Sequence, residues 1–366
     1  MYSYKYYNVA FLIDTVDIIN SRLKLKVEDA IIDVFKGFLK SDSSNIQFAF
    51  RITDNIDRFI TDTEFIRFKD VQVGKDQIYF SDNELSFLIN KSDPFNVVVN
   101  IDEDQSIKYS FRIFNKAFNS NIEKQIVTFY YRVFLLFSQL WNVQNGLSYI
   151  HSSAISVAGE SILFTASSGI GKSSLLLNFS QLAKFDFIAD DLTIISSESK
   201  SFYQGRSLSI KPYHLEHYPF LIDKLRSLMS LWQKLQWKII DDNRLTYRIC
   251  PLNLFNKVAE SSDIRRVFHL CNHSDSDYRI SDLSVDDFIK YNLSILSNEF
   301  FLANHKINTL ASLPDSPFPN TYSLYKEVKD IYLKAFESTE IKLVLIPYRS
   351  NPNDLYSFLN SEGCLG

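Results

Sequence analysis

Four residues near the middle of the chain, Gly169, Gly171, Lys172 and Ser173, have the types and the spacing that phosphate chemistry uses. Glycines let backbone N–H groups turn toward an anion without a Cβ in the way, and a helix that starts there adds its positive dipole end. A lysine can reach the outer phosphates, and a serine hydroxyl can ligate Mg²⁺. These residues therefore predict a phosphate-binding loop.

The loop matches the pattern G-x-x-x-x-G-K-[ST] except at its first position, where Ala166 stands in place of glycine. That position serves the turn out of the preceding strand, and alanine fits there when its φ is negative. We expect the nucleotide to contact the rest of the loop, which consists of Ser167, Ser168, Gly169, Ile170, Gly171, Lys172, Ser173 and Ser174. The alternative is a loop rich in serine and glycine that joins a strand to a helix only for packing.

The segments on either side of the loop fit the context that the motif requires. Ser161–Thr165 is a short apolar run typical of a buried strand, and Ser173–Leu182 reads as the start of a helix. The chain contains only 9 glycines among 366 residues, so two glycines one residue apart stand out against this background.

Two adjacent carboxylates, Asp190 and Asp191, follow in the segment FIADDLTII. A kinase needs one carboxylate to hold the metal and another to accept the proton of the attacking hydroxyl. Adjacent residues of a strand point to opposite faces, so both can face one cavity only if the strand ends or bends there. The alternative is a pair of aspartates at a strand end exposed to solvent.

The stretch from YIHSSAISVAGESILFTASSGIGKSSLLLNF to FIADDLTII resembles the catalytic domain of HPr kinase/phosphorylase and of HPr-kinase-like proteins. A histidine, an S-G-I-G-K-S loop and an A-D-D strand occur in the order of that family. The resemblance covers about residues 147–196 and implies an α/β fold. It implies an HPr-kinase/PEP-carboxykinase-like P-loop catalytic domain, here preceded by a smaller mixed β-rich domain.

The resemblance also implies a role for each matching residue, with ATP and Mg²⁺ as cofactors. Lys172 would bind and polarise the phosphates, Ser173 would ligate Mg²⁺, and Asp191 would take the hydroxyl proton. Asp190 would support the metal or its water shell, and His151 would stand near the transferred phosphate. Judged without the resemblance, a histidine beside two serines is more often a hydrogen-bonded residue at a strand end.

The sequence departs from the family pattern at two places. Ser174 stands where true HPr kinases have an acidic residue, and their downstream E-[IV]-R-G-L-G segment is absent. Lys211 and Glu216 lie in the corresponding region, where a glutamate in a polar loop is usually just solvated. HPr itself as acceptor, and the reverse phosphorolysis reaction, therefore do not follow from the resemblance.

The leading hypothesis is an ATP- and Mg²⁺-dependent kinase that transfers the γ-phosphate to a hydroxyl, with serine of a peptide or small protein as the expected acceptor. One alternative is a small-molecule kinase, for example of free serine. Another is a nucleotide-binding regulator without transfer activity. A decarboxylating PEP-carboxykinase-like enzyme would need further metal-ligating histidines and substrate arginines, which the sequence does not place.

The amino-acid composition indicates which classes of binding partner and which cellular compartment to expect. The chain is 46% hydrophobic and 22% charged, with a net charge of -4, and it has no run rich in lysine and arginine, so we expect no nucleic-acid binding. The apolar run Val127–Trp141 contains Arg132 and is too short to span a bilayer, so we expect no membrane association. Three cysteines without C-x-x-C spacing fit a reducing cytoplasm. A homo-oligomer is left open.

Hydrophobic patterning divides the chain into a β-rich domain at residues 1–120, a connecting helix at 121–146 and the nucleotide-binding domain at 147–366. The expected strands of the first domain are Asn8–Ile13, Ile46–Ile52, Glu64–Val71, Gln77–Phe80, Leu85–Ile89, Asn96–Ile101 and Ile107–Phe114. Val27–Leu39 and Ile122–Trp141 have helical spacing. In the last domain we expect strands at Tyr149–Val157 and Phe187–Ile195 on either side of the loop.

Overall fold

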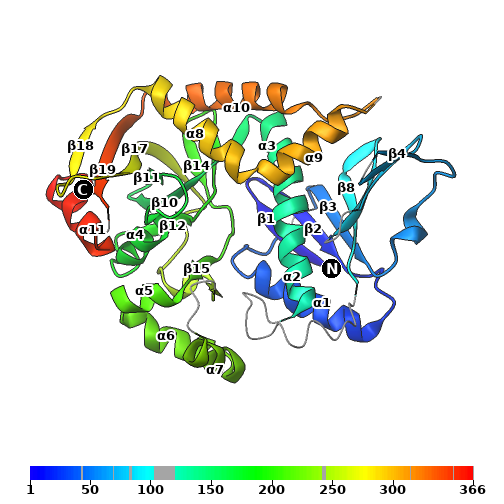
Figure 1. Cartoon of the computed structure of the whole chain (residues 1–366), viewed down its shortest axis with the longest axis horizontal. Coiled ribbons are helices and arrows are strands. Elements are labelled where there is room, and N and C mark those ends of the chain that lie inside the picture. Colours follow the sequence, from blue (N-terminus) through cyan, green and yellow to red (C-terminus); the bar gives the residue numbers. More distant parts are fainter. Residues whose placement is uncertain are drawn as a thin grey trace. The chain divides into compact units, whose positions relative to one another are not determined.

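The computed structural model describes residues 1–42, 44–68, 70–81, 85–102, 120–240, 245–313, 315–348 and 350–365, and Figure 1 shows its helices and strands. Within these residues the chain forms two units, each with its own sheet. Unit 1 comprises 1–102, 120–142 and 300–325, and unit 2 comprises 143–299 and 326–365.

The predicted α/β class is confirmed. The predicted division at 1–120, 121–146 and 147–366 differs from these units, because residues 300–325 group with the N-terminal sheet.

Unit 1 contains an eight-stranded mixed sheet in its described residues, with the order β1-β2-β3-β8-β7-β6-β5-β4. The strands are β1 (Tyr2–Tyr6), β2 (Val9–Asp14), β3 (Ile46–Thr53), β4 (Ile66–Phe68), β5 (Val71–Val73), β6 (Gln77–Ser81), β7 (Ser86–Asn90) and β8 (Asp93–Asn100). β3 pairs in parallel with β2 and with β8. Each of these strands is rich in aromatic and branched residues, which suit a pleated and half-buried surface.

The helices of unit 1 are α1 (Ser21–Val34), the short η1 (Ile56–Phe59), α2 (Asn121–Phe129), the π-helical turn η3 (Tyr130–Phe134), α3 (Leu135–Gln144) and α9 (Phe301–Ala311). The segment from α2 to α3 packs against the sheet of this unit through aromatic rings, as Phe129 against Phe50 and Phe134 against Phe11 show. Phe11 of β2 lies 5.5 Å from the ring of Phe48 and 4.9 Å from that of Phe134, measured between centroids. The core of this unit is therefore a cluster of packed rings.

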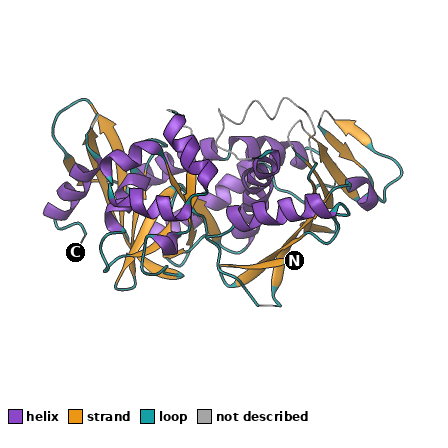
Figure 2. Ribbon diagram, turned by 90° about the horizontal axis from the view of Figure 1, so that it is seen from below, coloured by secondary structure: helices purple, strands orange, loops and turns teal. Residues whose placement is uncertain are grey.

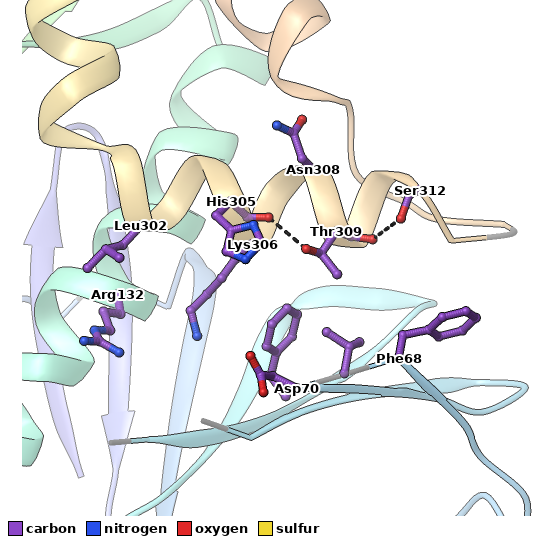
Figure 3. Close-up of a pocket in the computed structure, with 11 residues that line it drawn as sticks. Phe68, Asp70, Arg132, Leu302, His305, Lys306, Asn308, Thr309 and Ser312 are labelled. Carbon is purple, nitrogen blue, oxygen red and sulfur yellow. Dashed lines mark hydrogen bonds between the residues drawn. The ribbon is translucent and has the colours of Figure 1, made fainter. Parts of the chain in front are cut away.

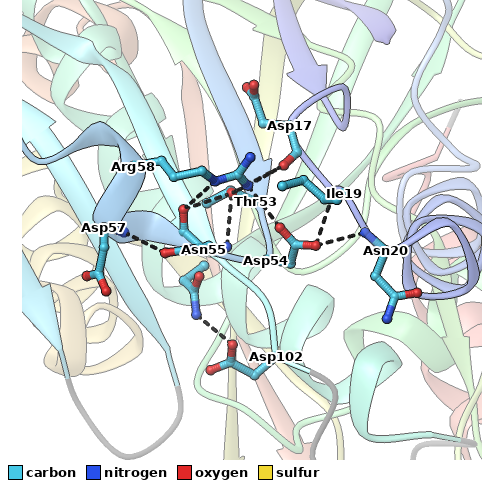
Figure 4. A network of polar contacts seen from close by, with 10 residues as sticks. Asp17, Ile19, Asn20, Thr53, Asp54, Asn55, Asp57, Arg58 and Asp102 are labelled. Atoms are coloured by element: carbon cyan, nitrogen blue, oxygen red, sulfur yellow. Dashed lines mark hydrogen bonds and ion pairs between the residues drawn. The ribbon is translucent and has the colours of Figure 1, made fainter.

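Helix α1 begins earlier than predicted and ends earlier, so the expected range Val27–Leu39 is wrong at both ends. The side chain of Asn20 caps the helix by accepting hydrogen bonds from two backbone N–H groups of its first turn. The carboxylate of Asp54 accepts two more from the backbone just before the helix, at 2.9 and 3.0 Å, and Arg58 binds that carboxylate (Figure 4). This network fixes the start of α1.

Unit 2 contains a nine-stranded mixed sheet and a separate β15–β16 pair in the part of the chain that is described. The strands are β9 (Leu147–Ile150), β10 (Ser152–Val157), β11 (Glu160–Thr165), β12 (Asp186–Ala189), β13 (Thr193–Ser196), β14 (Lys200–Phe202), β15 (Leu208–Ile210), β16 (Tyr247–Ile249), β17 (Ser261–His273), β18 (Arg279–Asp282) and β19 (Glu340–Pro347). The central β17 pairs in parallel with β11 and with β19, and β11 pairs antiparallel with β10.

The helices of unit 2 are drawn in purple against its orange strands in Figure 2. They are α4 (Lys172–Phe179), α5 (Pro212–His217), α6 (Phe220–Leu228), α7 (Leu231–Ile239), the short η4 (Pro251–Asn253), α8 (Val285–Glu299), α10 (Thr321–Phe336) and α11 (Pro352–Ser361). α4 packs on the sheet through Phe179, which stacks on Phe164 of β11 at 5.5 Å, and α11 contacts it through Tyr356 at 5.7 Å. No described helix is long and apolar enough to cross a membrane.

Three predicted elements are interrupted in the structure. The helix Ile122–Trp141 is confirmed but contains the π turn η3. Tyr149–Val157 is two strands separated at His151, and Phe187–Ile195 is two strands separated after Ala189, so the prediction of single strands was wrong at both places. The predicted strand Ile107–Phe114 lies outside the described residues.

Candidate functional site

The phosphate-loop segment joins β11 to α4, so the strand, loop and helix expected from the sequence are present. Gly169 has φ of 88° and Gly171, the residue before α4, has φ of 104°. L-residues rarely adopt such values, and a Cβ built on either glycine would meet no atom within 4 Å. These two glycines are therefore required by backbone conformation, and the space beside them is open.

Ala166, which replaces the first glycine of the pattern, is completely buried and lies outside the set of residues with positive φ. Its carbonyl accepts a hydrogen bond from the ammonium of Lys172 at 2.9 Å. Alanine therefore fits the turn, and its carbonyl helps to hold the lysine.

Lys172 is only 6% exposed, and its ammonium has hydrogen-bond partners in the loop and at His151. It donates to the carbonyls of Ala166 and Ser167, at 2.9 and 3.2 Å, and it lies 2.9 Å from Nε2 of His151. Burial lowers the pKa of Lys172 to about 8, against the opposing effect of the nearby Asp190 and Glu299 carboxylates. The ammonium form still predominates at pH 7, so the loop keeps a positive charge.

His151 occupies the break between β9 and β10, and it faces the lysine from there. Burial, together with Lys172 and Arg206, lowers the pKa of His151 to about 3, so the ring is neutral at pH 7. Because the ammonium donates to Nε2, the ring proton resides on Nδ1. Nδ1 is buried without a hydrogen-bond partner among the described residues, 3.6 Å from Asp191 and 4.0 Å from Glu299.

The two aspartates can face one site because strand β12 ends directly before them. β12 stops at Ala189, and Asp191 adopts a left-handed φ of 73°. One oxygen of Asp190 accepts hydrogen bonds from the hydroxyls of Ser153 at 2.7 Å and Ser173 at 2.9 Å. The structure thus brings Asp190 to the loop serine.

Asp191 turns toward a different set of partners in the same site. Its carboxylate forms an ion pair with Arg206 and lies near the His151 ring. A left-handed aspartate is uncommon, and such conformations concentrate at functional sites because surrounding contacts must hold them. The bend separates the two carboxylates: one contacts the loop serine, and the other contacts a histidine and an arginine.

Three further residues belong to the site and were missed by the sequence analysis: Ser153, Arg206 and Glu299. Ser153 is two residues after His151, and alternate residues of a strand share a face, so this spacing could have placed Ser153 near the histidine. Arg206 lies beside Gly205, which has φ of 92°, within a loop that gave no recognised pattern. Glu299 is the last residue of α8 and accepts a hydrogen bond from Ser168 of the phosphate loop at 2.9 Å. Glu299 is far from the loop in the sequence, so its place at the site depends on the tertiary fold.

Of the residues that stand where the sequence departs from the family, Ser174 directly follows Ser173 in α4, whereas Lys211 and Glu216 lie at α5. The carbonyl of Ser174 accepts a hydrogen bond at 2.7 Å from Tyr218, just after α5, so this serine contacts that region. Glu216 is exposed, as expected for a solvated glutamate, and Lys211 precedes α5.

The oxygen atoms of Ser173 and Asp190 suit a magnesium ion, since Mg²⁺ prefers hard oxygen ligands. They lie 2.9 Å apart in the structure. No group of three or more histidine, cysteine or acidic side chains within the described residues could hold a metal by itself.

No family model matches the sequence, and no curated protein matches it. Among solved structures, the chain is similar to the Hpr(Ser) kinase/phosphatase from Coxiella burnetii at 10% identity, over 59% of this chain and 90% of that one, with a TM-score of 0.28. This is a distant structural likeness to a protein of the family that the sequence resembles.

Proposed function

We propose that the cluster around Lys172 binds ATP with Mg²⁺ and transfers the γ-phosphoryl group to a hydroxyl, with serine of a peptide or small protein as the acceptor. The observation that carries this proposal is the arrangement of two carboxylates around the loop. Asp190 contacts the loop serine at 2.9 Å, while Asp191 is turned by its positive φ toward His151 and Arg206. A site that only binds a nucleotide needs the first carboxylate and not the second.

The loop residues would hold the polyphosphate. Backbone N–H groups at the start of α4 and the open space beside Gly169 and Gly171 suit an anion. The ammonium of Lys172 would leave its carbonyl partners to contact the outer phosphates, since a charge-assisted bond to phosphate is stronger than one to a neutral carbonyl. The metal, held by Ser173 and Asp190, would neutralise charge on the phosphates.

Asp191 would accept the proton of the attacking hydroxyl. Its side chain is 35% exposed, so an acceptor can reach it, whereas the Asp190 residue is only 4% exposed. Arg206 holds the Asp191 carboxylate in position by the ion pair, and the neutral His151 presents its Nδ1–H toward the same carboxylate. Arg206 and His151 are therefore positioning residues for the base in this proposal.

The proposal is tested by transfer of labelled γ-phosphate from ATP, in the presence of Mg²⁺, to a panel of serine peptides and to free serine. The purified chain should label a hydroxyl acceptor, and Lys172→Ala should abolish labelling at ATP concentrations that saturate the wild type. Labelling of free serine alone would favour a small-molecule kinase. Tight ATP binding with no labelling of any acceptor would refute the kinase and leave a nucleotide-binding regulator.

A further inference from the structure

Unit 1 contains a pocket of about 680 Å³ that is separate from the residues of the nucleotide site (Figure 3). Helix α9 forms one wall, Phe68, Asp70, Val71 and Phe80 of the sheet side form the facing wall, and Arg132 of the π turn η3 lies at one end. Pockets that hold small organic ligands typically measure about 300–1,000 Å³. π-Helical turns are rare and are frequently found at functional sites.

The two walls carry charges of opposite sign. Lys306 and Arg132 come from the helical side, and Asp70 comes from the strand side, as Figure 3 shows. Lys306 is only 8% exposed, and its ammonium lies 4.8 Å from the centre of the Phe80 ring and 5.2 Å from that of Phe87. Ring faces stabilise a cation electrostatically, so the charge is held at the pocket wall.

Apolar side chains complete the lining and are open to solvent. Phe68 is 45% exposed and Leu302 is 53% exposed, and they belong to opposite walls of the pocket. Covering such side chains with an apolar ligand group is favourable in proportion to the area removed from water. The pocket thus combines two cations, one carboxylate and an apolar surface within a volume suited to a small molecule.

We propose that this pocket binds a free α-amino acid with a large apolar side chain. The ligand carboxylate would face Arg132 and Lys306, its ammonium would face Asp70, and its side chain would cover Phe68, which lies beyond Asp70 in Figure 3. A simple organic anion would meet repulsion from Asp70, and a simple amine would meet repulsion from the two cations. A dipolar ligand satisfies both walls, because each of its charges faces a residue of opposite sign.

The probes that test this inference share one apolar group and differ only in charge. Calorimetric titration of the full chain compares L-phenylalanine with 3-phenylpropanoate, which lacks the ammonium, and with 2-phenylethylamine, which lacks the carboxylate. Each missing charge removes a charge-assisted contact, so phenylalanine should bind roughly ten- to a hundred-fold more tightly than either analogue. Equal or tighter binding of the propanoate or the amine, or no binding of phenylalanine at millimolar concentration, would overturn the proposal.

Variants locate the binding site and separate this proposal from the proposed kinase. Lys306→Met keeps the apolar stem and should weaken phenylalanine binding at least ten-fold. Asp70→Asn changes an exposed residue, so it should keep the fold while giving the same loss. Lys75→Met, at an exposed lysine outside the pocket, is the matched control and should bind like the wild type. Lys172→Ala should also bind phenylalanine normally, whether or not the chain is a kinase; unchanged binding in both pocket variants would contradict the assignment.

Discussion

The two units bury different kinds of side chain. The centre of unit 1 is a cluster of aromatic rings, including Phe11, Phe48 and Phe134, which are at most 1% exposed. Unit 2 gathers buried titratable groups around one loop, namely His151, Lys172, Asp190 and His269, whereas the buried Glu123 and Lys306 of unit 1 lie outside its ring cluster. Burying such groups costs free energy unless they are hydrogen-bonded or paired, so their clustering around one loop marks a candidate functional site.

Unit 2 compensates for this burial mainly with short hydrogen bonds among its own side chains. Ser152 donates to Thr193 at 2.7 Å, Ser153 donates to Asp190 at 2.7 Å, and Thr165 lies 2.9 Å from Nδ1 of His269. The phenylalanine rings of unit 1 have no polar atom to pair, and the hydroxyl of the buried Tyr6 donates to Asn142 at 3.0 Å. The difference predicts that substitutions and pH changes around the loop alter binding and catalysis, whereas substitutions among the rings alter only stability.

The largest expected effect separates the two adjacent aspartates. Asp191→Asn preserves the size of the side chain but removes the proton acceptor, so phosphoryl transfer should fall by roughly 10²–10⁴-fold while ATP affinity changes little. Asp190→Asn is the matched control and should instead raise the Mg²⁺ concentration needed, since its proposed role is to support the metal. Transfer rates measured across a Mg²⁺ series check both. A wild-type rate for Asp191→Asn would show that the base is misassigned.

Acid should destabilise the chain through its buried histidines. The pKa of His151 is about 3 in the folded chain and 6.5 in the reference state, so the unfolded chain binds the proton first as pH falls. Stability from this group is therefore complete above pH 6.5 and is lost progressively down to pH 3. Between pH 7 and pH 5 the loss amounts to about 2 kcal/mol. Burial also lowers the pKa values of His214 and His269, to about 4.

Urea unfolding of the wild type and His151→Gln at pH 7 and pH 5 measures this contribution. The variant should lose less stability on acidification than the wild type does. Phe11→Leu, a change within the ring cluster of unit 1, should lower stability equally at both pH values and thereby serves as the control. An equal acid-induced loss in the wild type and His151→Gln would contradict the buried neutral histidine.

Glu299 places a negative charge against the loop that is proposed to hold phosphates. Its carboxylate is 29% exposed, and the contact with Ser168 is 2.9 Å. Glu299→Gln removes the charge and keeps a hydrogen-bond acceptor, so repulsion of about 1 kcal/mol should be relieved and ATP should bind about five-fold more tightly. Calorimetry measures the change. Weaker ATP binding in this variant would mean that Glu299 contributes to the nucleotide or metal site.

The smallest expected effect is at Ala166. Its φ is not positive, so glycine offers no relief of strain, and Ala166→Gly should leave ATP affinity within a few-fold of the wild type. The same titration checks this. A gain of two orders of magnitude would indicate that the natural loop is a degenerate phosphate site.

Local sequence patterns predicted many of the residues that meet at the candidate site, because these residues lie within two short segments. The loop glycines, Lys172 and Ser173 follow a strand and begin a helix, and the condition that the chain must bend at Asp190 and Asp191 is met in the structure. The break at His151 was not predicted, and the break after Ala189 was stated only as a condition, with Phe187–Ile195 predicted as one strand, since both interrupt continuous apolar runs. Hydrophobic periodicity indicates which residues are buried, but it does not show where a buried strand is interrupted. At both breaks a polar side chain, His151 or Asp190, hydrogen-bonds within the site.

Residues that reach the site from distant parts of the chain left no local signal. Glu299 ends an ordinary amphipathic helix, and Arg206 lies in a short loop after β14. The unit boundary was hidden for the same reason: α9 packs in unit 1 although it lies far from the other residues of that unit in the sequence. These contacts join residues that are far apart in the sequence, so no local motif or periodic pattern indicates them.

The central claim, that this loop is a working nucleotide site, is tested most directly by titrating ATP and Mg²⁺ into the wild type and Lys172→Ala. Loss of the ammonium removes a charge-assisted contact with phosphate, worth roughly 1.5–3 kcal/mol, so affinity should fall by about ten- to a hundred-fold. Equal affinity of the two proteins for ATP, measured by calorimetry under the same conditions, would contradict the account.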